Sequence, residues 1–243
     1  MVISIFDSPD AAAVAVADQI CDALVTKPAA VLGLPAGRTP VPLYAELRRR
    51  YAAGEIDFSR VTTFNLDEFI GIGPAAPGSF RRFMDEQIFS GVNIPASQIH
   101  FLDGLAPDIA AECRRYEAAL ADAGGIDIQL LGIGANGHIG FNEPADELNA
   151  ATHAVQLLPA TRQANAASFG GDVTRVPESA LTMGIGTILS AREVILMAAG
   201  ERKAHCVERM VEGGVTPRLP ASLLQLHPRV RLFLDRSAAS QLA

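Results

Sequence analysis

A glycine-rich loop near the middle of the chain carries the residue types best suited to chemistry. An apolar run over residues 126–133 leads into it, and Asn136, His138 and Glu143 follow between glycines. A short apolar run that ends in glycines is typical of a buried strand that opens into a tight loop. A histidine accepts and releases protons near neutral pH, and a carboxylate beside it can take part in the transfer. The loop is therefore a candidate site of acid–base catalysis.

Two acidic residues form a second candidate. Asp67 and Glu68 come directly after residues 61–66, which are predicted to form a strand. Acidic residues in that place cap a helix, lie on a solvated edge or take part in catalysis. Because ligands of open α/β sheets bind beyond the carboxyl ends of the strands, Asp67 is a candidate catalytic carboxylate.

A third candidate is an anion site at Gly37, Arg38 and Thr39. These residues lie between a predicted strand at 29–34 and a predicted helix at 40–53, with Thr39 as the helix N-cap. Backbone N–H groups converge at such a junction, and the helix dipole favours negative charge. Arg38 adds a formal positive charge. The alternative is an ordinary turn and cap, and no Gly-Lys-Ser/Thr follows that would make a Walker A loop.

Lys203 is a candidate because of its place in the chain. It lies in the first turn of a helix that is predicted to begin at Gly200. A cation is unfavourable there against the helix dipole, so its position indicates a functional role.

Strands and helices alternate along most of the chain. Further strands are predicted at residues 2–6, 98–102, 180–184, 194–199 and 230–234, and further helices at residues 10–25, 77–89, 107–123 and 186–190. This alternation predicts an α/β fold, with a doubly wound, mostly parallel, Rossmann-like sheet and helices on both faces, in a single domain over residues 1–243. Right-handed crossovers bring the loops after strands to one edge. One cleft is therefore expected to collect four residues that each follow a strand: Thr39, Asp67, His138 and Lys203.

Residues 145–176 differ from the rest of the chain. Apolar periodicity weakens there, and small and polar residues dominate. A long segment of this kind beside a candidate site is typical of a mobile lid, and the alternative is a surface loop with one poor helix.

The composition narrows the class of protein. Of 243 residues, 49% are hydrophobic and 19% are charged, as in a folded, core-forming protein. The formal net charge of −7 argues against a nucleic-acid partner, which needs a basic surface. No apolar run approaches about 18 residues and no signal-peptide pattern is present, so we expect no membrane span and a cytoplasmic location. The three cysteines have no metal-binding spacing, which fits free thiols in a reducing compartment.

Three alternative chemistries fit the glycine-rich loop less well. Residues 132–137 match the dinucleotide pattern Gly-x-Gly-x-x-Gly, but residues 138–144 make a poor helix and no acidic strand end follows about 20 residues later. His138, Glu143 and Asp67 could surround a metal ion, but no ligand spacing favours this. A serine nucleophile would need a Gly-x-Ser-x-Gly elbow, which the sequence lacks. Acid–base chemistry by these three side chains is the remaining interpretation.

From end to end, the chain resembles the glucosamine-6-phosphate deaminase (isomerase) family. The block Gly-His-Ile-Gly-Phe-Asn-Glu-Pro is specific, because the related 6-phosphogluconolactonases share a Gly-His loop but lack the Phe-Asn-Glu-Pro that follows. The matching blocks are residues 32–40, 63–69, 132–144, 181–186, 200–204 and 226–228.

The resemblance implies conversion of glucosamine 6-phosphate and water into fructose 6-phosphate and ammonia, with no metal or other cofactor. Asp67 would remove the C2 proton and return it to C1. His138 would move the proton that opens the sugar ring, and Glu143 would orient and charge-balance His138. Asn136, which stands where some members carry aspartate, would assist ring opening.

The same resemblance implies that Gly37, Arg38, Thr39 and Lys203 bind the phosphate. Arg38 stands where a small residue is usual, and Ala167 stands where members commonly place an arginine on the phosphate. We hypothesise that Arg38 replaces this missing arginine, because a guanidinium binds phosphate bidentately.

Other functions stay open at this point. They are the same deamination of galactosamine 6-phosphate, hydrolysis of a lactone, and non-catalytic sensing of a sugar phosphate. Residues 142–144 disfavour a lactonase, and the retention of Asp67, His138 and Glu143 disfavours a sensor. The one partner expected is a small aminosugar phosphate, bound by a monomer or small homo-oligomer.

Overall fold

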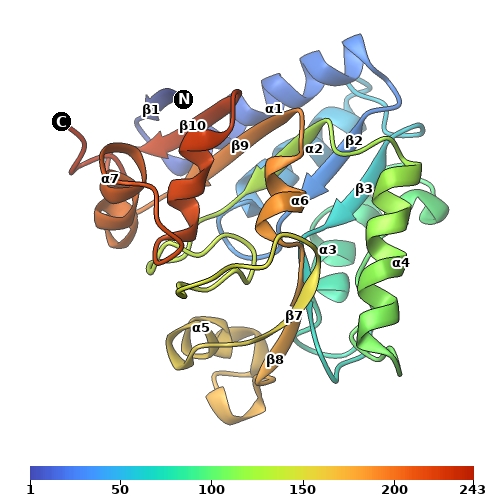
Figure 1. The fold of residues 1–243 in the computed structure, drawn as a ribbon. Helices are drawn as coiled ribbons and strands as arrows, with labels where there is room; N and C mark the ends of the chain where they lie inside the picture. The colour runs from blue at the N-terminus through green and yellow to red at the C-terminus, as the bar shows by residue number, and fades with distance from the viewer.

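The computed structural model describes residues 1–243 and contains a seven-stranded sheet in which every neighbouring pair of strands is parallel. The strand order is β1-β10-β9-β6-β2-β3-β5 (Figure 1). The strands are β1 (Val2–Phe6), β2 (Val31–Leu34), β3 (Thr62–Asn65), β5 (Ile99–His100), β6 (Ile128–Leu131), β9 (Glu193–Ala198) and β10 (Val230–Asp235). The predicted α/β fold with a mostly parallel sheet is confirmed.

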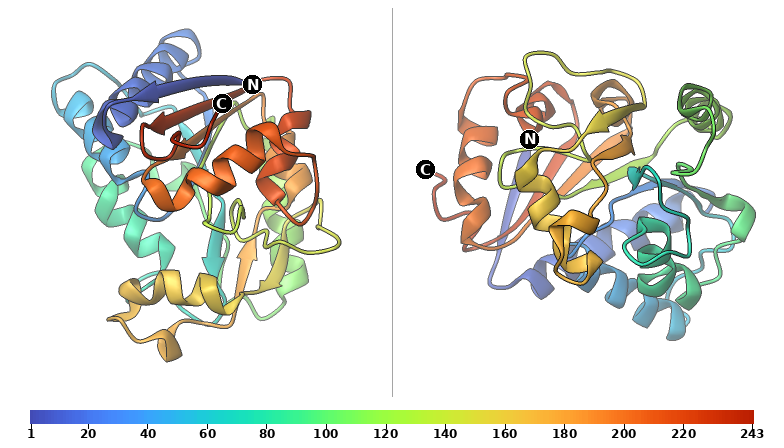
Figure 2. Two further views of the ribbon diagram at one scale, coloured as in Figure 1. Left: turned by 90° about the vertical axis from the view of Figure 1, so that its left-hand side faces the viewer. Right: turned by 90° about the horizontal axis from the view of Figure 1, so that it is seen from below.

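Helices cover both faces of this sheet, as the alternation predicts (Figures 1 and 2). One face packs against α1 (Pro9–Thr26), α2 (Val41–Ala52) and α3 (Phe80–Gln87), and the other against α4 (Ile109–Asp122), α6 (Ile185–Leu189) and α7 (Ala204–Glu212). Clusters of 24 and 30 buried apolar residues, respectively, fill these two layers. No helix is both long enough and apolar enough to cross a membrane.

Chain order creates a topological switch between β2 and β6. From β2 the chain continues to β3 on one side, whereas from β6 it continues to β9 on the other. Ligands of open α/β sheets bind beyond the carboxyl ends of the strands at such a point. The segments after the four adjacent strands β9, β6, β2 and β3 hold Lys203, His138, Thr39 and Asp67, respectively.

The prediction that Thr39 caps α2 was wrong. The N-cap residue is Pro40, and no side chain binds the free N–H groups of this helix. The Val41 N–H already donates to the Arg38 carbonyl at 3.3 Å, and Pro42 has no N–H. The two positions that an N-cap at Thr39 would bind, 41 and 42, therefore offer it no free N–H group.

A second, smaller sheet was not predicted. It is antiparallel, with the order β4-β8-β7, and lies below the main sheet in Figure 1. Its strands are β4 (Asp67–Phe69), β7 (His153–Gln156) and β8 (Ser179–Thr182). Asp67 and Glu68 therefore lie in a buried strand rather than in a loop, and the strand predicted at 180–184 pairs outside the parallel sheet.

Residues 145–176 supply one strand of this second sheet, and other parts of the segment pack against it. Leu157, Phe169 and Val176 are buried in an apolar cluster of eight residues that also contains Phe69 of β4. The segment contains β7, α5 (Pro159–Asn165) and two turns of 3-10 helix at Ala166–Phe169 and Val173–Arg175. The one poor helix expected there is α5.

Candidate active site

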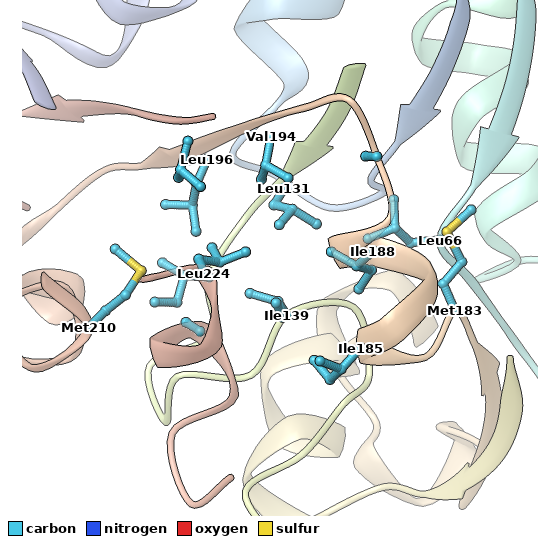
Figure 3. Packing of buried hydrophobic residues seen from close by; sticks show 14 of the residues in the cluster. Leu66, Leu131, Ile139, Met183, Ile185, Ile188, Val194, Leu196, Met210 and Leu224 are labelled. Carbon is cyan, nitrogen blue, oxygen red and sulfur yellow. The ribbon is translucent and has the colours of Figure 1, made fainter. Parts of the chain in front are cut away.

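The glycine-rich loop after β6 is closed by its own backbone. The Gly134 N–H donates to the His138 carbonyl at 2.9 Å, and the Gly137 N–H donates to the Gly134 carbonyl at 3.0 Å. Gly137 has a φ of 86°, a left-handed conformation that favours glycine. Ile139 packs in the buried apolar cluster below the loop (Figure 3). His138 is therefore held between a closed turn and an anchored side chain.

His138, Glu143 and Asn136 form a small hydrogen-bonding network. The His138 Nδ1 lies 3.4 Å from the Glu143 Oε2. The Asn136 Nδ2 donates to the same Oε2 at 2.9 Å, and the Asn136 Oδ1 accepts from the His138 backbone N–H at 3.2 Å. A carboxylate that faces Nδ1 favours the tautomer with its proton there, which leaves Nε2 to exchange a proton with a ligand.

Glu143 is buried, yet its surroundings favour the charged carboxylate. Burial alone would raise its pKa, but the neighbouring His138, Thr161 and Asn136 side chains outweigh burial, so the pKa of Glu143 is lowered. Thr161 belongs to α5, so the segment 145–176 supplies part of this environment. An ionised Glu143 can orient His138 and stabilise its protonated form.

Asp67 is a buried carboxyl group that is only 8% exposed. Burial raises the pKa of Asp67 to about 8, and the charge of Glu68 adds to the shift. Tyr44 and Tyr116 lie near enough that the Asp67 charge, together with burial, raises the pKa of each phenol. A carboxyl group that titrates near neutral pH can take up a proton and return it.

Thr182 connects the strand of Asp67 to the glycine-rich loop. It pairs with Asp67 in the register of β4 and β8, and its Oγ1 accepts a hydrogen bond from the Phe141 N–H at 3.1 Å. The next residue, Met183, donates its N–H to the Leu66 carbonyl at 2.7 Å. Both candidate groups are therefore fixed to the same strand, β8.

The loop after β2 forms one wall of a cavity of about 310 Å³. Gly37, with a φ of 105°, and the exposed Arg38 line this wall. The other walls come from α3 and from the 3-10 helix after α5, where Ala167 lies. Thr39, Asp67, His138 and Lys203 do not belong to the lining of this cavity.

The helix that Lys203 begins contacts the glycine-rich loop through Cys206. The Cys206 Sγ lies 3.3 Å from the Gly134 carbonyl oxygen and 3.2 Å from the Lys203 carbonyl oxygen, and its one thiol hydrogen is shared between them. Lys203 is the N-cap residue of α7, and partial burial lowers the pKa of its ammonium. A partly desolvated cation interacts strongly with an anion, so this position suits a negatively charged ligand.

Comparison with known proteins identifies the family. Residues 7–232 match the family described as Glucosamine-6-phosphate isomerases/6-phosphogluconolactonase. The chain belongs to this family. A glucosamine-6-phosphate deaminase of Halothermothrix orenii is 49% identical over 231 residues, which cover 95% of this chain and 94% of that protein. Glucosamine-6-phosphate deaminase 2 of Bacillus subtilis is 49% identical over 224 residues, which cover 92% of this chain and 90% of that protein.

Solved structures of this family fall at two levels of similarity. A monomeric glucosamine-6-phosphate deaminase has a TM-score of 0.96 and 41% identity, covering 99% of this chain and 100% of that one. A 6-phosphogluconolactonase from Trypanosoma cruzi has a TM-score of 0.81 but only 20% identity, covering 100% of this chain and 97% of that one. At that level the likeness shows the fold alone. The resemblance to the deaminase (isomerase) family is confirmed.

Sequence reasoning missed two side chains that organise this member of the glucosamine-6-phosphate isomerase family. Thr182 binds the glycine-rich loop, and Thr161 contributes to the environment of Glu143. Glu68, for which helix capping was one interpretation, binds the start of α3. Thr182 is the polar residue of the strand predicted at 180–184, so it carried a weak signal. Thr161 carried none, because the sequence does not show that α5 approaches the loop.

No group of three or more His, Cys, Asp or Glu side chains is placed to hold a metal ion. The three cysteines Cys21, Cys113 and Cys206 are free thiols.

Proposed function

We propose that this protein is a glucosamine-6-phosphate deaminase, which converts glucosamine 6-phosphate and water into fructose 6-phosphate and ammonia. The observation that carries the proposal is the near-complete match to deaminases, with 49% identity over 92% and 95% of the chain. The deaminase structure with a TM-score of 0.96 supports it. The buried Asp67 and the pairing of His138 with Glu143 are the side chains that such a reaction requires.

In the proposed reaction, His138 opens the pyranose ring. Its Nε2 takes the proton of the C1 hydroxyl and then delivers a proton to the ring oxygen, so the histidine acts first as a base and then as an acid. Glu143, 3.4 Å from Nδ1, stabilises the imidazolium that forms between the two transfers. Asn136 holds Glu143 in this position.

Asp67 then acts on the open-chain sugar. It removes the proton from C2 and returns it to C1, which leaves an imine at C2 that water hydrolyses to the ketone and ammonia. One carboxyl group both accepts and returns the proton, so a pKa near the working pH serves both halves of the transfer. The pKa of about 8 at Asp67 supports this role.

We propose that the anion loop and Lys203 bind the sugar phosphate. Gly37 and Thr39 offer backbone and hydroxyl donors near the start of α2, and Lys203 offers a partly buried ammonium. Arg38 and Ala167 line the same cavity, which supports the hypothesis that Arg38 takes the place of the arginine missing at position 167.

The phosphate role of Arg38 is testable by substitution. Arg38→Ala is expected to raise KM for the sugar phosphate about tenfold or more with little change in kcat, because a charge-assisted hydrogen bond is worth about 1.5–3 kcal/mol. Arg60→Ala is a matched control, since Arg60 is exposed and precedes β3 at the opposite end of the strands. An unchanged KM in Arg38→Ala would exclude this role.

We propose that residues 145–176 form a lid over the site. The Leu158 N–H lies 3.4 Å from the Glu143 Oε1, and residues 164, 165, 167 and 168 line the cavity. The segment therefore touches both the acid–base network and the expected phosphate end.

One experiment tests the function and its alternatives. The protein is incubated separately with glucosamine 6-phosphate, galactosamine 6-phosphate and 6-phosphogluconolactone, and ammonia, ketose and acid are measured. Ammonia and fructose 6-phosphate from the first substrate are expected. Faster ammonia release from galactosamine 6-phosphate would show that the protein acts on that epimer. Hydrolysis of the lactone alone would show a lactonase, and no turnover of any of the three compounds would favour a non-catalytic sensor.

We also propose that the protein is cytoplasmic and that it is a monomer or a small homo-oligomer. Its three free thiols support the cytoplasmic location.

A further inference from the structure

Glu68 is a buried carboxylate with an unusually complete set of hydrogen-bond donors. It is 3% exposed. Its Oε1 accepts from the N–H groups of Phe69 at 2.9 Å and Phe80 at 3.0 Å. Its Oε2 accepts from the Ser79 hydroxyl at 2.8 Å and the Arg81 N–H at 2.9 Å. Three of these four donors belong to the start of α3, so the side chain joins β4 to that helix.

The free N–H groups of the first turn of α3 all depend on Glu68 or on Ser79. Phe80 and Arg81 donate to Glu68, as above. The Arg82 N–H donates to the Ser79 Oγ at 3.4 Å, and the Phe83 N–H donates to the Ser79 carbonyl at 3.0 Å. A negative charge is also favourable at a helix N-terminus. The start of α3 therefore has its polar groups satisfied only when the Glu68 carboxylate is in place.

We propose that Glu68 is a positioning residue, whose carboxylate ties α3, and with it one wall of the cavity, to the strand that carries Asp67. Phe80, Arg82 and Phe83 of α3 line the cavity opposite the anion loop. Asp67 precedes Glu68 directly, so this clamp fixes the expected phosphate end of the substrate relative to the base. The inference rests on the proposed function, since it needs Asp67 to be the base.

The charge of Glu68 has a second consequence for Asp67. Burial raises the pKa of both carboxyl groups, but for Glu68 four hydrogen-bond donors oppose the effect of burial. For Asp67 burial and the Glu68 charge act in the same direction. A negative Glu68 therefore helps to keep Asp67 protonated to a higher pH.

Few other charged groups face this pair. Tyr44 of α2 and Tyr116 of α4 lie near Asp67, and both phenols have raised pKa values, so they stay neutral. From α3, the Arg81 guanidinium is paired with Asp85, with Nε 3.0 Å from Oδ1. Glu68 is thus the charge that most directly affects Asp67.

Three variants separate the clamp from the charge. Glu68→Gln keeps the shape and one acceptor oxygen but removes the charge. The NH2 group of the glutamine cannot accept the hydrogen bonds that the second carboxylate oxygen accepts in the wild type. Glu68→Asp keeps the charge but shortens the reach by one methylene. Ser79→Ala removes one donor to Glu68 and leaves its charge. Ammonia release is first measured for the wild-type protein, which tests the proposed function by itself, and kcat and KM are then measured against pH for each variant.

Each variant has a distinct expected result. In Glu68→Gln the acid limb of kcat/KM is expected to move to lower pH by about one unit, because a neighbouring like charge is gone. In Glu68→Asp and Ser79→Ala the limb is expected to stay, while KM rises about tenfold through the loosened α3. Ionisations of the substrate are common to all variants and cancel in the comparison. An unchanged KM in both Glu68→Asp and Ser79→Ala would overturn the clamp, and an unmoved limb in Glu68→Gln would overturn the effect of the Glu68 charge on Asp67.

Amide hydrogen exchange provides a readout that needs no activity. The N–H groups of Phe80 and Arg81 are expected to exchange at least about tenfold faster in Glu68→Asp than in the wild type, with other α3 amides less affected. Unchanged exchange at both amides would refute the clamp even if the wild type released no ammonia. Should Glu68→Gln fail to fold, the exchange and KM values of Glu68→Asp and Ser79→Ala still decide the matter.

Discussion

Gly134→Ala tests the position of His138 without replacing any titratable side chain. A Cβ at residue 134 would lie 2.4 Å from Cε1, 2.5 Å from Nδ1 and 2.6 Å from Nε2 of the His138 ring. Comfortable contacts between non-bonded carbon atoms begin at about 3.5 Å, so the ring must move by about 1 Å. Gly134 does not have a positive φ, so its backbone accepts alanine. The substitution therefore displaces the imidazole rather than the loop.

The expected cost follows from this displacement. A shift of about 1 Å in a catalytic group lowers the rate by about 100-fold, so kcat for ammonia release from glucosamine 6-phosphate should fall by that factor. KM should change little, because the phosphate site is untouched. Gly132→Ala is the matched control in the same loop, since no atom lies within 4 Å of its added Cβ. It should stay within about threefold of the wild type, a margin of about 0.7 kcal/mol.

Thermal unfolding accompanies the kinetics of both glycine variants. A midpoint within a few degrees of the wild type shows that a loss of rate comes from the displaced ring and not from unfolding. If Gly134→Ala retains the kcat of Gly132→Ala, the position of His138 does not limit the reaction, and its role in ring opening is wrong.

Further predictions concern Asp67 and Asn136. Asp67→Asn should lower kcat by about 1,000-fold while sugar-phosphate binding, measured by calorimetry, survives; persistent ammonia release would contradict the mechanism. The pKa of Asp67 in the folded protein, about 8, lies above the pKa of an aspartate in the unfolded chain. The contribution of Asp67 to the free energy of unfolding of the wild type is therefore lost as the pH rises from about 4 to 8. Asp67→Asn should therefore melt above the wild type at pH 9, and equal or lower melting would show that the carboxyl group titrates normally. Asn136→Ala should lower kcat/KM about tenfold, because Glu143 loses a donor at 2.9 Å, and a full rate would show that Glu143 alone orients His138.

The main sheet and its helices could be predicted because their signals are local. Ser8 and Pro9 mark the start of α1, and the structure has Ser8 accepting from the Ala11 N–H at 3.1 Å. The apolar runs predict the parallel strands. Because the crossovers between parallel strands are right-handed, the loops after these strands lie at one edge of the sheet. Thr39 shows the limit of such signals, because its role as a cap depended on donors that Val41 and Pro42 could not supply.

The second sheet could not be predicted because its pairing is not local. Asp67 and Thr182 are paired across more than a hundred residues of chain, and an apolar run does not tell which partner a strand will find. Two adjacent acidic residues are also typical of a loop or a helix cap. Glu68 does cap a helix, but that helix begins twelve residues later, and Glu68 itself lies in a buried strand.

The junction between the two sheets explains the properties of Asp67. The chain leaves the parallel sheet at Asn65 and joins the antiparallel one at Asp67, with only Leu66 between them. Asp67 is therefore buried by both layers, and burial is the main cause of its raised pKa. Because β8 pairs with β4 and also binds the glycine-rich loop through Thr182, one strand sets the distance between the proposed base and the proposed ring-opening histidine. A carboxyl group in an ordinary loop at the edge of the sheet would be hydrated and would titrate near 4, further from the working pH than the buried Asp67. The unpredicted sheet thus accounts for the burial, and with it the raised pKa, of the predicted carboxylate.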